Sequence, residues 1–189
     1  MARTVFDERN SIFSDAAHEA AKVKVYPKVW PGADIDFIST TIQNDPKNFI
    51  NNTLDGDMGI DRILDVKKDL ATPLRFTIQE RFRRPLSADG GLKYYKYRDI
   101  TITEWNEASD LKSELYKIQS DYFLYGYFNE NTGCFGEAIL VDVPFLKTGI
   151  INNTLVWEGK KNKKGQRFIC IKFDNLIKTP GCVYHEKFY

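Results

Sequence analysis

Residues 74–83 read Leu-Arg-Phe-Thr-Ile-Gln-Glu-Arg-Phe-Arg, with a clean alternation of apolar and polar side chains. Such a period of two predicts a strand whose successive side chains point to opposite faces. One face would carry Leu74, Phe76, Ile78 and Phe82, and the other would carry Arg75, Thr77, Gln79, Arg81 and Arg83. Glu80 interrupts the apolar face. Because a buried carboxylate costs free energy unless it is paired, we expect Glu80 to be ion-paired or functional.

Patterns on both sides of this segment predict an α/β protein. Helical spacing of apolar residues predicts helices at 11–25, at about 106–119 and near 144–149. The other strands are expected at 34–42, 58–66, about 94–103, 121–128, 135–142 and 166–174. Residues 121–128 are almost continuously apolar, which is typical of a strand buried on both faces. This order favours a sandwich with a central mixed β-sheet flanked by helices.

Length and composition exclude several classes of protein. A chain of 189 residues with 42% hydrophobic residues can bury a full core, so we expect a single folded domain over 1–189. Three cysteines without a CxxC pair, and two histidines, give little support to a zinc site, a disulfide framework or a cysteine–histidine or serine–histidine nucleophile. The first residues are too polar for a signal peptide, so we expect a cytoplasmic protein.

A net charge of only +1 conceals segments of opposite charge. The acidic residues of one stretch are Asp55, Asp57, Asp61, Asp65 and Asp69. Basic residues dominate 75–98 and 160–172. Hydrolysis of a phosphodiester needs this division, because carboxylate oxygens hold Mg²⁺ while lysine and arginine neutralise phosphates. The charge pattern therefore favours a metal-dependent reaction on a nucleic acid.

Asp61 is followed 18 residues later by Gln79-Glu80-Arg81 on the next expected strand. Antiparallel neighbours in a hairpin can bring these side chains close to one ion. Here the sequence resembles the PD-(D/E)xK nuclease superfamily, which has an acid on one strand and an acid-x-Lys triplet on the next. A variant of that family carries Gln in place of the second acid. The resemblance covers about residues 10–128 and implies the restriction-endonuclease-like fold for this core, followed by a C-terminal strand extension at about 129–189.

The resemblance implies a role for each matching residue. Asp61 would be the main ligand of Mg²⁺, or of Mn²⁺ as a substitute, and Gln79 would take the second motif position. Glu80 would reach the ion through its side chain or its carbonyl, and Glu19 would supply an outer carboxylate. Arg81 takes the Lys position. Since it stays charged, it can stabilise an oxyanion but cannot accept a proton from water.

The function implied is a Mg²⁺-dependent endonuclease, phage-type or restriction-type, that hydrolyses DNA. A homodimer would allow two sites to cut two strands. The residues expected to contact DNA are all basic: Arg83, Arg84, Lys93, Lys96, Arg98, Lys160, Lys161, Lys163 and Lys164. Two alternatives remain open. The chain could be a catalytically degenerate nuclease-fold protein that binds nucleic acid without cutting it, or an interaction protein that binds an acidic partner.

Individual residues also have alternative interpretations without catalysis. Asp61 and Arg81 could form only a cross-strand ion pair, and Glu19 could lie on a solvated helix face. The lysines of 160–164 could be a solvated hairpin tip, and the aromatic residues of 121–128 could belong to the core. Strand alternation also places Gln79 and Glu80 on opposite faces, so both side chains cannot reach one ion without a bulge.

Overall fold

The computed structural model describes residues 5–39, 58–68, 72–84, 98–106, 111–112, 114–163 and 165–188. In this part of the chain, no helix has both the length and the apolar character needed to cross a membrane. The elements are α1 (Val5–Lys24), α2 (Tyr26–Val29), β1 (Asp34–Ser39), β2 (Arg62–Lys67), β3 (Leu74–Arg83), β4 (Asp99–Asn106), β5 (Leu111–Lys112), α4 (Glu114–Lys117), β6 (Tyr122–Asn129), β7 (Cys134–Asp142), α5 (Val143–Ile151), β8 (Glu158–Lys161), β9 (Gln166–Lys172), α6 (Phe173–Leu176) and β10 (Cys182–Lys187).

The larger sheet has six strands in the order β1-β2-β3-β6-β7-β10. The first three strands form an antiparallel meander. β6 then lies parallel to β3, with Glu80 opposite Leu124, and the remaining pairs are antiparallel. A parallel neighbour requires a crossover connection, and the chain between β3 and β6 makes this crossover. The sheet is therefore mixed, as the sequence predicts.

A second sheet of four strands has the order β5-β4-β9-β8 and is antiparallel throughout. Its central pair joins distant segments, with Ile100 opposite Ile171 and Ile102 opposite Ile169. The sequence patterns predict the strands β4 and β9, but they do not predict that these strands form a sheet separate from the central one. The second sheet is therefore a feature that the sequence analysis missed.

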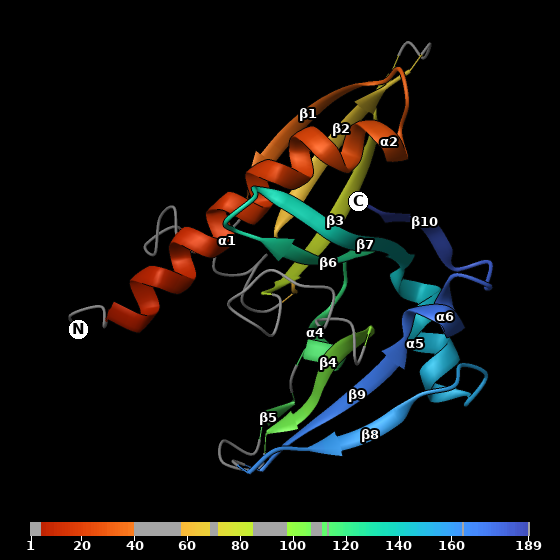
Figure 1. The fold of residues 1–189 in the computed structure, drawn as a ribbon. Coiled ribbons are helices and arrows are strands. Elements are labelled where there is room, and N and C mark those ends of the chain that lie inside the picture. Colours follow the sequence, from red (N-terminus) through yellow and green to blue (C-terminus); the bar gives the residue numbers. More distant parts are fainter. Residues whose placement is uncertain are drawn as a thin grey trace.

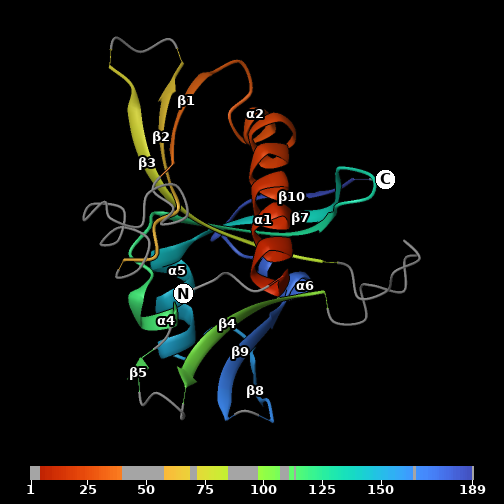
Figure 2. The ribbon, with the colours of Figure 1, turned by 90° about the vertical axis from the view of Figure 1, so that its left-hand side faces the viewer.

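Helices and a second sheet cover the two faces of the six-stranded sheet (Figures 1 and 2). An apolar core lies on each face. α1 crosses one face and packs Phe13, Ala17 and Ala21 against it. The four-stranded sheet, α4, α5 and α6 cover the opposite face. β6 contributes to both cores, since Phe123 belongs to one and Leu124 to the other. This double burial explains its continuous apolar sequence.

Most expected elements are present. The strand over 74–83 is confirmed, and those at 121–128, 135–142 and 166–174 are confirmed within two residues at each end. The strand expected at 58–66 begins only at Arg62, and the first helix already begins at Val5. Of the strand expected at 34–42, β1 confirms the part up to Ser39, and the rest lies outside the described residues. Residues 94–97, the start of the strand expected at about 94–103, also lie outside the described residues.

Of the helix expected at 106–119, only Glu114–Lys117 are confirmed, residues 106 and 111–112 are strand instead, and residues 107–110 and 113 lie outside the described part of the chain. The apolar stripe behind the prediction is real in part, because Leu115 and Ile118 are both buried in the core. Two buried residues three positions apart need only one helical turn. The sequence analysis also missed β8, α6 and β10.

Candidate functional site

β3 carries the candidate site, and its two faces have different surroundings. Ile78 and Phe82 pack against α1 and its core, and Glu80 points the same way, because it bonds with His18 of α1. We call this side the Glu80 face. Gln79, Arg81 and Arg83 form the opposite Gln79 face. The alternation expected from the sequence therefore holds along the whole motif.

Asp61 lies beside the motif on the neighbouring strand. Its main-chain N–H donates to the carbonyl of Ile78 at 2.9 Å, although Ile78 is the register partner of Arg62, so the main chain of Asp61 is also tied to β3. Its Oδ2 accepts a bond from Gln79 Nε2 at 2.7 Å and one from the main-chain N–H of Glu80 at 2.6 Å. The expected proximity of Asp61 and Gln79 is confirmed. Asp61 is buried, with 6% of its surface exposed, so its orientation is fixed.

Gly59 helps to hold the amide of Gln79. Its φ of +59° lies in the left-handed region, and an added Cβ would lie only 2.7 Å from Gln79 Oε1. The amide is thus held between the Gly59 backbone and the Asp61 carboxylate. A rotation of the amide by 180° would turn Oε1 toward Asp61. A glycine here both adopts the backbone conformation and leaves room for the amide.

Arg81 forms an ion pair with Glu114 of α4, whose Oε1 lies 2.7 Å from Arg81 Nη2. The N–H direction does not favour a hydrogen bond, so among the described residues Glu114 Oε1 has no hydrogen-bonded partner. Burial raises the pKa of Glu114, although Arg81 and a bond from the Thr103 main-chain N–H oppose this shift. Arg81 does not form the alternative cross-strand pair with Asp61 among the described residues.

Glu114 is a residue that the sequence analysis missed. It is 90% buried, since only 10% of its side chain is exposed, and its partner in the ion pair occupies the motif position of the family lysine. The only local signal is a carboxylate at the start of a short helix that precedes a buried strand. That signal does not distinguish Glu114 from an ordinary residue of a helix first turn.

The expected metal ligands Glu80 and Glu19 do not join Asp61. Glu80 points to the other face of β3, because successive side chains of a strand alternate between its two faces. Glu19 lies on the exposed side of α1 and pairs with Lys22 at 2.6 Å. Within the described ranges, no three side chains from histidine, cysteine, aspartate and glutamate gather as a metal site would need.

Glu80 instead lies at the centre of a buried polar network. His18 Nδ1, the Tyr26 hydroxyl and Arg62 Nε all bond its carboxylate, the last at 3.1 Å. Burial by itself raises the pKa of Glu80, but the bond and charge of His18, the charge of Arg62 and the bond from Tyr26 outweigh it, so the pKa lies below its usual value. The expectation that Glu80 is ion-paired is confirmed.

Residues expected to contact DNA have varied surroundings. Arg83 Nε donates to the Tyr125 hydroxyl at 3.1 Å, and Arg84 pairs with Glu130 at 3.0 Å. Arg98 makes two bonds to Glu137, at 2.8 and 2.6 Å, so its guanidinium is held by a carboxylate. Lys93, Lys96 and Lys164 lie outside the described residues.

The remaining expected contacts lie on the β8–β9 hairpin. Lys160, Lys161 and Lys163 are exposed there, which agrees with the hairpin-tip interpretation and leaves them accessible to a phosphate backbone. Lys160 Nζ also lies 3.3 Å from Asp99 Oδ2. Burial raises the pKa of Asp99, and Lys160 opposes this shift.

The donors near Asp61 suit a hard cation. Mg²⁺ prefers oxygen ligands, keeps several waters and often uses one or two protein carboxylates together with substrate phosphates. The Asp61 carboxylate and the Gln79 amide oxygen, once the amide is rotated, could supply two oxygens on the Gln79 face. This set is small for a magnesium site, yet it matches a cation that is completed by water and by the substrate.

The fold and this site define an α/β protein in which a buried carboxylate just before β2 bonds a half-buried amide on β3 of a mixed sheet. Comparison with known proteins does not narrow the class further. No protein-family model matches the chain, and no curated protein or solved structure matches it either. The functional argument therefore rests on the chemistry of the residues themselves.

Proposed function

We propose that this protein is a Mg²⁺-dependent endonuclease that hydrolyses DNA phosphodiester bonds, of the phage or restriction type. The observation that carries the proposal is the 2.7 Å contact between Asp61 and Gln79. It brings together two motif positions that are 18 residues apart in the sequence. Arg81 follows on the same face, so a carboxylate, an amide and a cation lie on one side of β3.

The order of elements also supports the proposal. In the resembled family, a helix and strands with the motif precede a helix–strand unit that completes the core. Here α1 precedes the β1–β2–β3 meander, and α4 leads into β6, which pairs with β3 in parallel. Gln79 and Arg81 lie on β3, and Asp61 immediately precedes β2, an arrangement similar to the one that the resemblance implies.

In the proposed mechanism, the residues of this chain bind and orient the substrate. Asp61, fixed by the main chain of β3, would hold the cation together with Gln79. A bound Mg²⁺ supplies Lewis acidity and lowers the pKa of a water molecule. Arg81 would donate to the scissile phosphate and stabilise the charge that develops there. Glu114 would keep the guanidinium of Arg81 at the site, because the two side chains are already paired.

A second candidate is a nuclease-fold protein that binds DNA without cutting it. The specific observation in its favour is that the motif side chain bonded to Asp61 is the amide of Gln79 and not a second carboxylate, since the carboxylate of Glu80 faces α1. Arginine at the lysine position adds to this, because it cannot relay a proton. Both candidates predict salt-dependent DNA affinity, and only the first predicts metal-dependent cleavage.

The deciding experiment incubates the purified full chain with supercoiled plasmid in Mg²⁺, in Mn²⁺ and in EDTA. We expect nicked or linear product only with a metal, and none with Asp61→Asn. Asp65→Asn is the matched control, because Asp65 is a β2 carboxylate that pairs with the exposed Arg75 instead. Wild-type DNA binding without cleavage in any metal would favour the second candidate. Equal cleavage by both variants would remove Asp61 from the site.

A further inference from the structure

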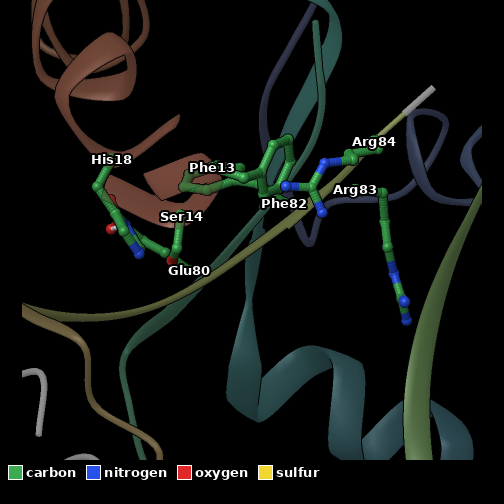
Figure 3. Close-up of a pocket in the computed structure, with 7 residues that line it drawn as sticks. All are labelled: Phe13, Ser14, His18, Glu80, Phe82, Arg83 and Arg84. Carbon is green, nitrogen blue, oxygen red and sulfur yellow. Dashed lines mark hydrogen bonds and ion pairs between the residues drawn. The ribbon is translucent and has the colours of Figure 1, made fainter. Parts of the chain in front are cut away.

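A pocket lies between α1 and the Glu80 face of β3. Its volume is about 480 Å³, within the usual range for small-molecule sites. Its walls combine apolar rings with polar side chains: Phe13, Ser14, His18, Glu80, Phe82, Arg83 and Arg84. Figure 3 shows Arg83 turned away from the other six. None of these pocket residues takes part in the proposed cleavage step.

His18 lines this pocket and has one ring nitrogen without a protein partner among the described residues. Only 10% of its side chain is exposed, and its Nδ1 is bonded to Glu80, whose side chain is completely buried. An ionised Glu80 can only accept, so Nδ1 bears a proton, and in the imidazolium form Nε2 bears one as well and can donate. The other ring nitrogen, Nε2, has no hydrogen-bonded partner within the described part of the chain. A buried ring with one anchored and one open nitrogen is ready to bond a ligand.

Two further groups give the pocket the character of an anion site. Ser14 lies one helical turn before His18, so its hydroxyl is on the same side of α1. The Arg84 guanidinium lies 4.1 Å from the centre of the Phe13 ring, at the pocket wall, and its Nε pairs with Glu130 at 3.0 Å. The negative charge of Glu80 is balanced by Arg62, 3.1 Å away. An anion would therefore meet donors rather than an uncompensated carboxylate.

The apolar walls limit what the anion can be. Phe13 and Phe82 line the pocket, and the Phe82 ring packs edge-on against His18 at 5.2 Å. A bare phosphate would leave most of this volume empty. An organic group joined to the phosphate would fill that space and bury apolar surface.

We infer that this pocket binds a phosphate monoester of nucleotide size. In this complex His18 would be the imidazolium, so the phosphate would accept bonds from its Nε2–H, from the Ser14 hydroxyl and from Arg84, and the organic part would pack against Phe13 and Phe82. Charge-assisted bonds of this kind are the usual means of phosphate recognition. The inference does not rest on the proposed nuclease activity, because it uses no residue of the Gln79 face.

The test uses the small number of histidines. The chain has two, so NMR of the imidazole groups gives two sets of signals, which His185→Gln assigns. His185 of β10 bonds Glu137 at 2.7 Å and serves as an internal reference. In EDTA, we expect adenosine 5′-monophosphate to shift the His18 signals and leave those of His185 unchanged. Adenosine and inorganic phosphate should each bind at least about tenfold more weakly, since each lacks half of the recognised groups.

Variants test the contacts individually. Ser14→Ala keeps a good helix former, and we expect it to weaken nucleotide binding about tenfold, as should Arg84→Gln. Arg75→Gln, which alters an arginine on β3 outside the pocket, should change nothing. The inference is overturned if millimolar nucleotide leaves His18 unshifted, if adenosine or phosphate binds equally well, or if Arg75→Gln weakens binding as much as Arg84→Gln. Asp61→Asn should bind normally, which separates this test from that of cleavage.

Discussion

The side-chain amide of Gln79 occupies the space that a Cβ on Gly59 would need. The two residues approach so closely that a Cβ would be 2.7 Å from Gln79 Oε1. Gly59 precedes Asp61 by two residues, so a single short segment supplies both the carboxylate and the surface against which the amide rests. The geometry of the candidate site is therefore sensitive to a residue that has no side chain.

Gly59→Ala should lower the rate of cleavage by about tenfold or more, because the added methyl displaces the Gln79 amide from Asp61. Gly32→Ala is a matched control: its φ is also positive, at +75°, and nothing lies within 4 Å of the added Cβ. Both variants place an alanine in the left-handed backbone region, which costs about 1 kcal/mol of stability. Single-turnover rates and melting temperatures are measured on both. A similar loss of rate in Gly32→Ala would show that the effect is one of stability.

Arg81→Ala should reduce the single-turnover rate by roughly 10²–10³, since it removes a donor to the transition state. Arg81→Lys should retain measurable activity, because a cation remains within reach. Arg81→Ala should also lower the melting temperature, because it leaves Glu114 buried without its ion pair. Glu114→Gln breaks the same pair but keeps the guanidinium. If Arg81→Ala melts early yet cuts at the full wild-type rate, Arg81 is only a structural partner of Glu114.

Glu80→Gln and Glu114→Gln should have opposite effects on stability at neutral pH. The pKa of Glu80 is lowered on folding, so its charge stabilises the fold above about pH 4.3, and this stabilisation is lost as pH falls through the folded-state value. Glu80→Gln leaves Arg62 unpaired and should cost about 3 kcal/mol at pH 7. The pKa of Glu114 is raised, so its ionisation destabilises the fold as pH rises through the folded-state pKa.

We therefore expect Glu114→Gln to keep or gain stability at pH 7, while Glu80→Gln loses it and shows a shallower decline in acid. Urea unfolding between pH 3 and pH 7 measures both effects. Equal losses of stability for the two variants at pH 7 would contradict the assigned directions of the pKa shifts.

Removal of basic residues should weaken DNA binding independently of sequence. Lys161→Ala, Lys163→Ala and Lys93→Ala should each reduce the slope of log affinity against log salt by about one unit, as expected for one phosphate contact. Lys178→Ala is the control, since Lys178 is an exposed lysine near the C-terminal end of α6. Fluorescence anisotropy with a short duplex measures the slopes. Identical slopes across the series would mean that these lysines are only solvated surface.

Local patterns of the sequence predict local features correctly. The alternation over 74–83 predicts both the strand and the separation of Gln79 from Glu80, because side-chain direction in a strand depends only on residue parity. The contact between Asp61 and Gln79 follows in the same way, since β2 and β3 are adjacent antiparallel strands. These features require no knowledge of distant segments.

The features that the sequence analysis missed depend on distant segments. Glu80 is satisfied by residues from α1, α2 and β2, and their convergence cannot be read from spacing alone. Arg81 meets Glu114 only because the tertiary fold brings these two distant segments together. Likewise, the strand pattern at 99–103 is visible in the sequence, yet its partner β9 lies beyond β7. Tertiary pairing decides which sheet a strand joins, and the local period of the sequence does not reveal that pairing.

The two sheets are interleaved along the chain, and this affects the order in which the protein can fold. β4 is synthesised before β6 but must wait for β9, and β7 must wait for β10. Each sheet therefore closes only after part of the other has been made. Pairings between such distant segments are entropically costly to form and slow folding. The nascent chain would expose the apolar strand β6 before its cover arrives, so a chaperone or a slow late step is expected during its synthesis.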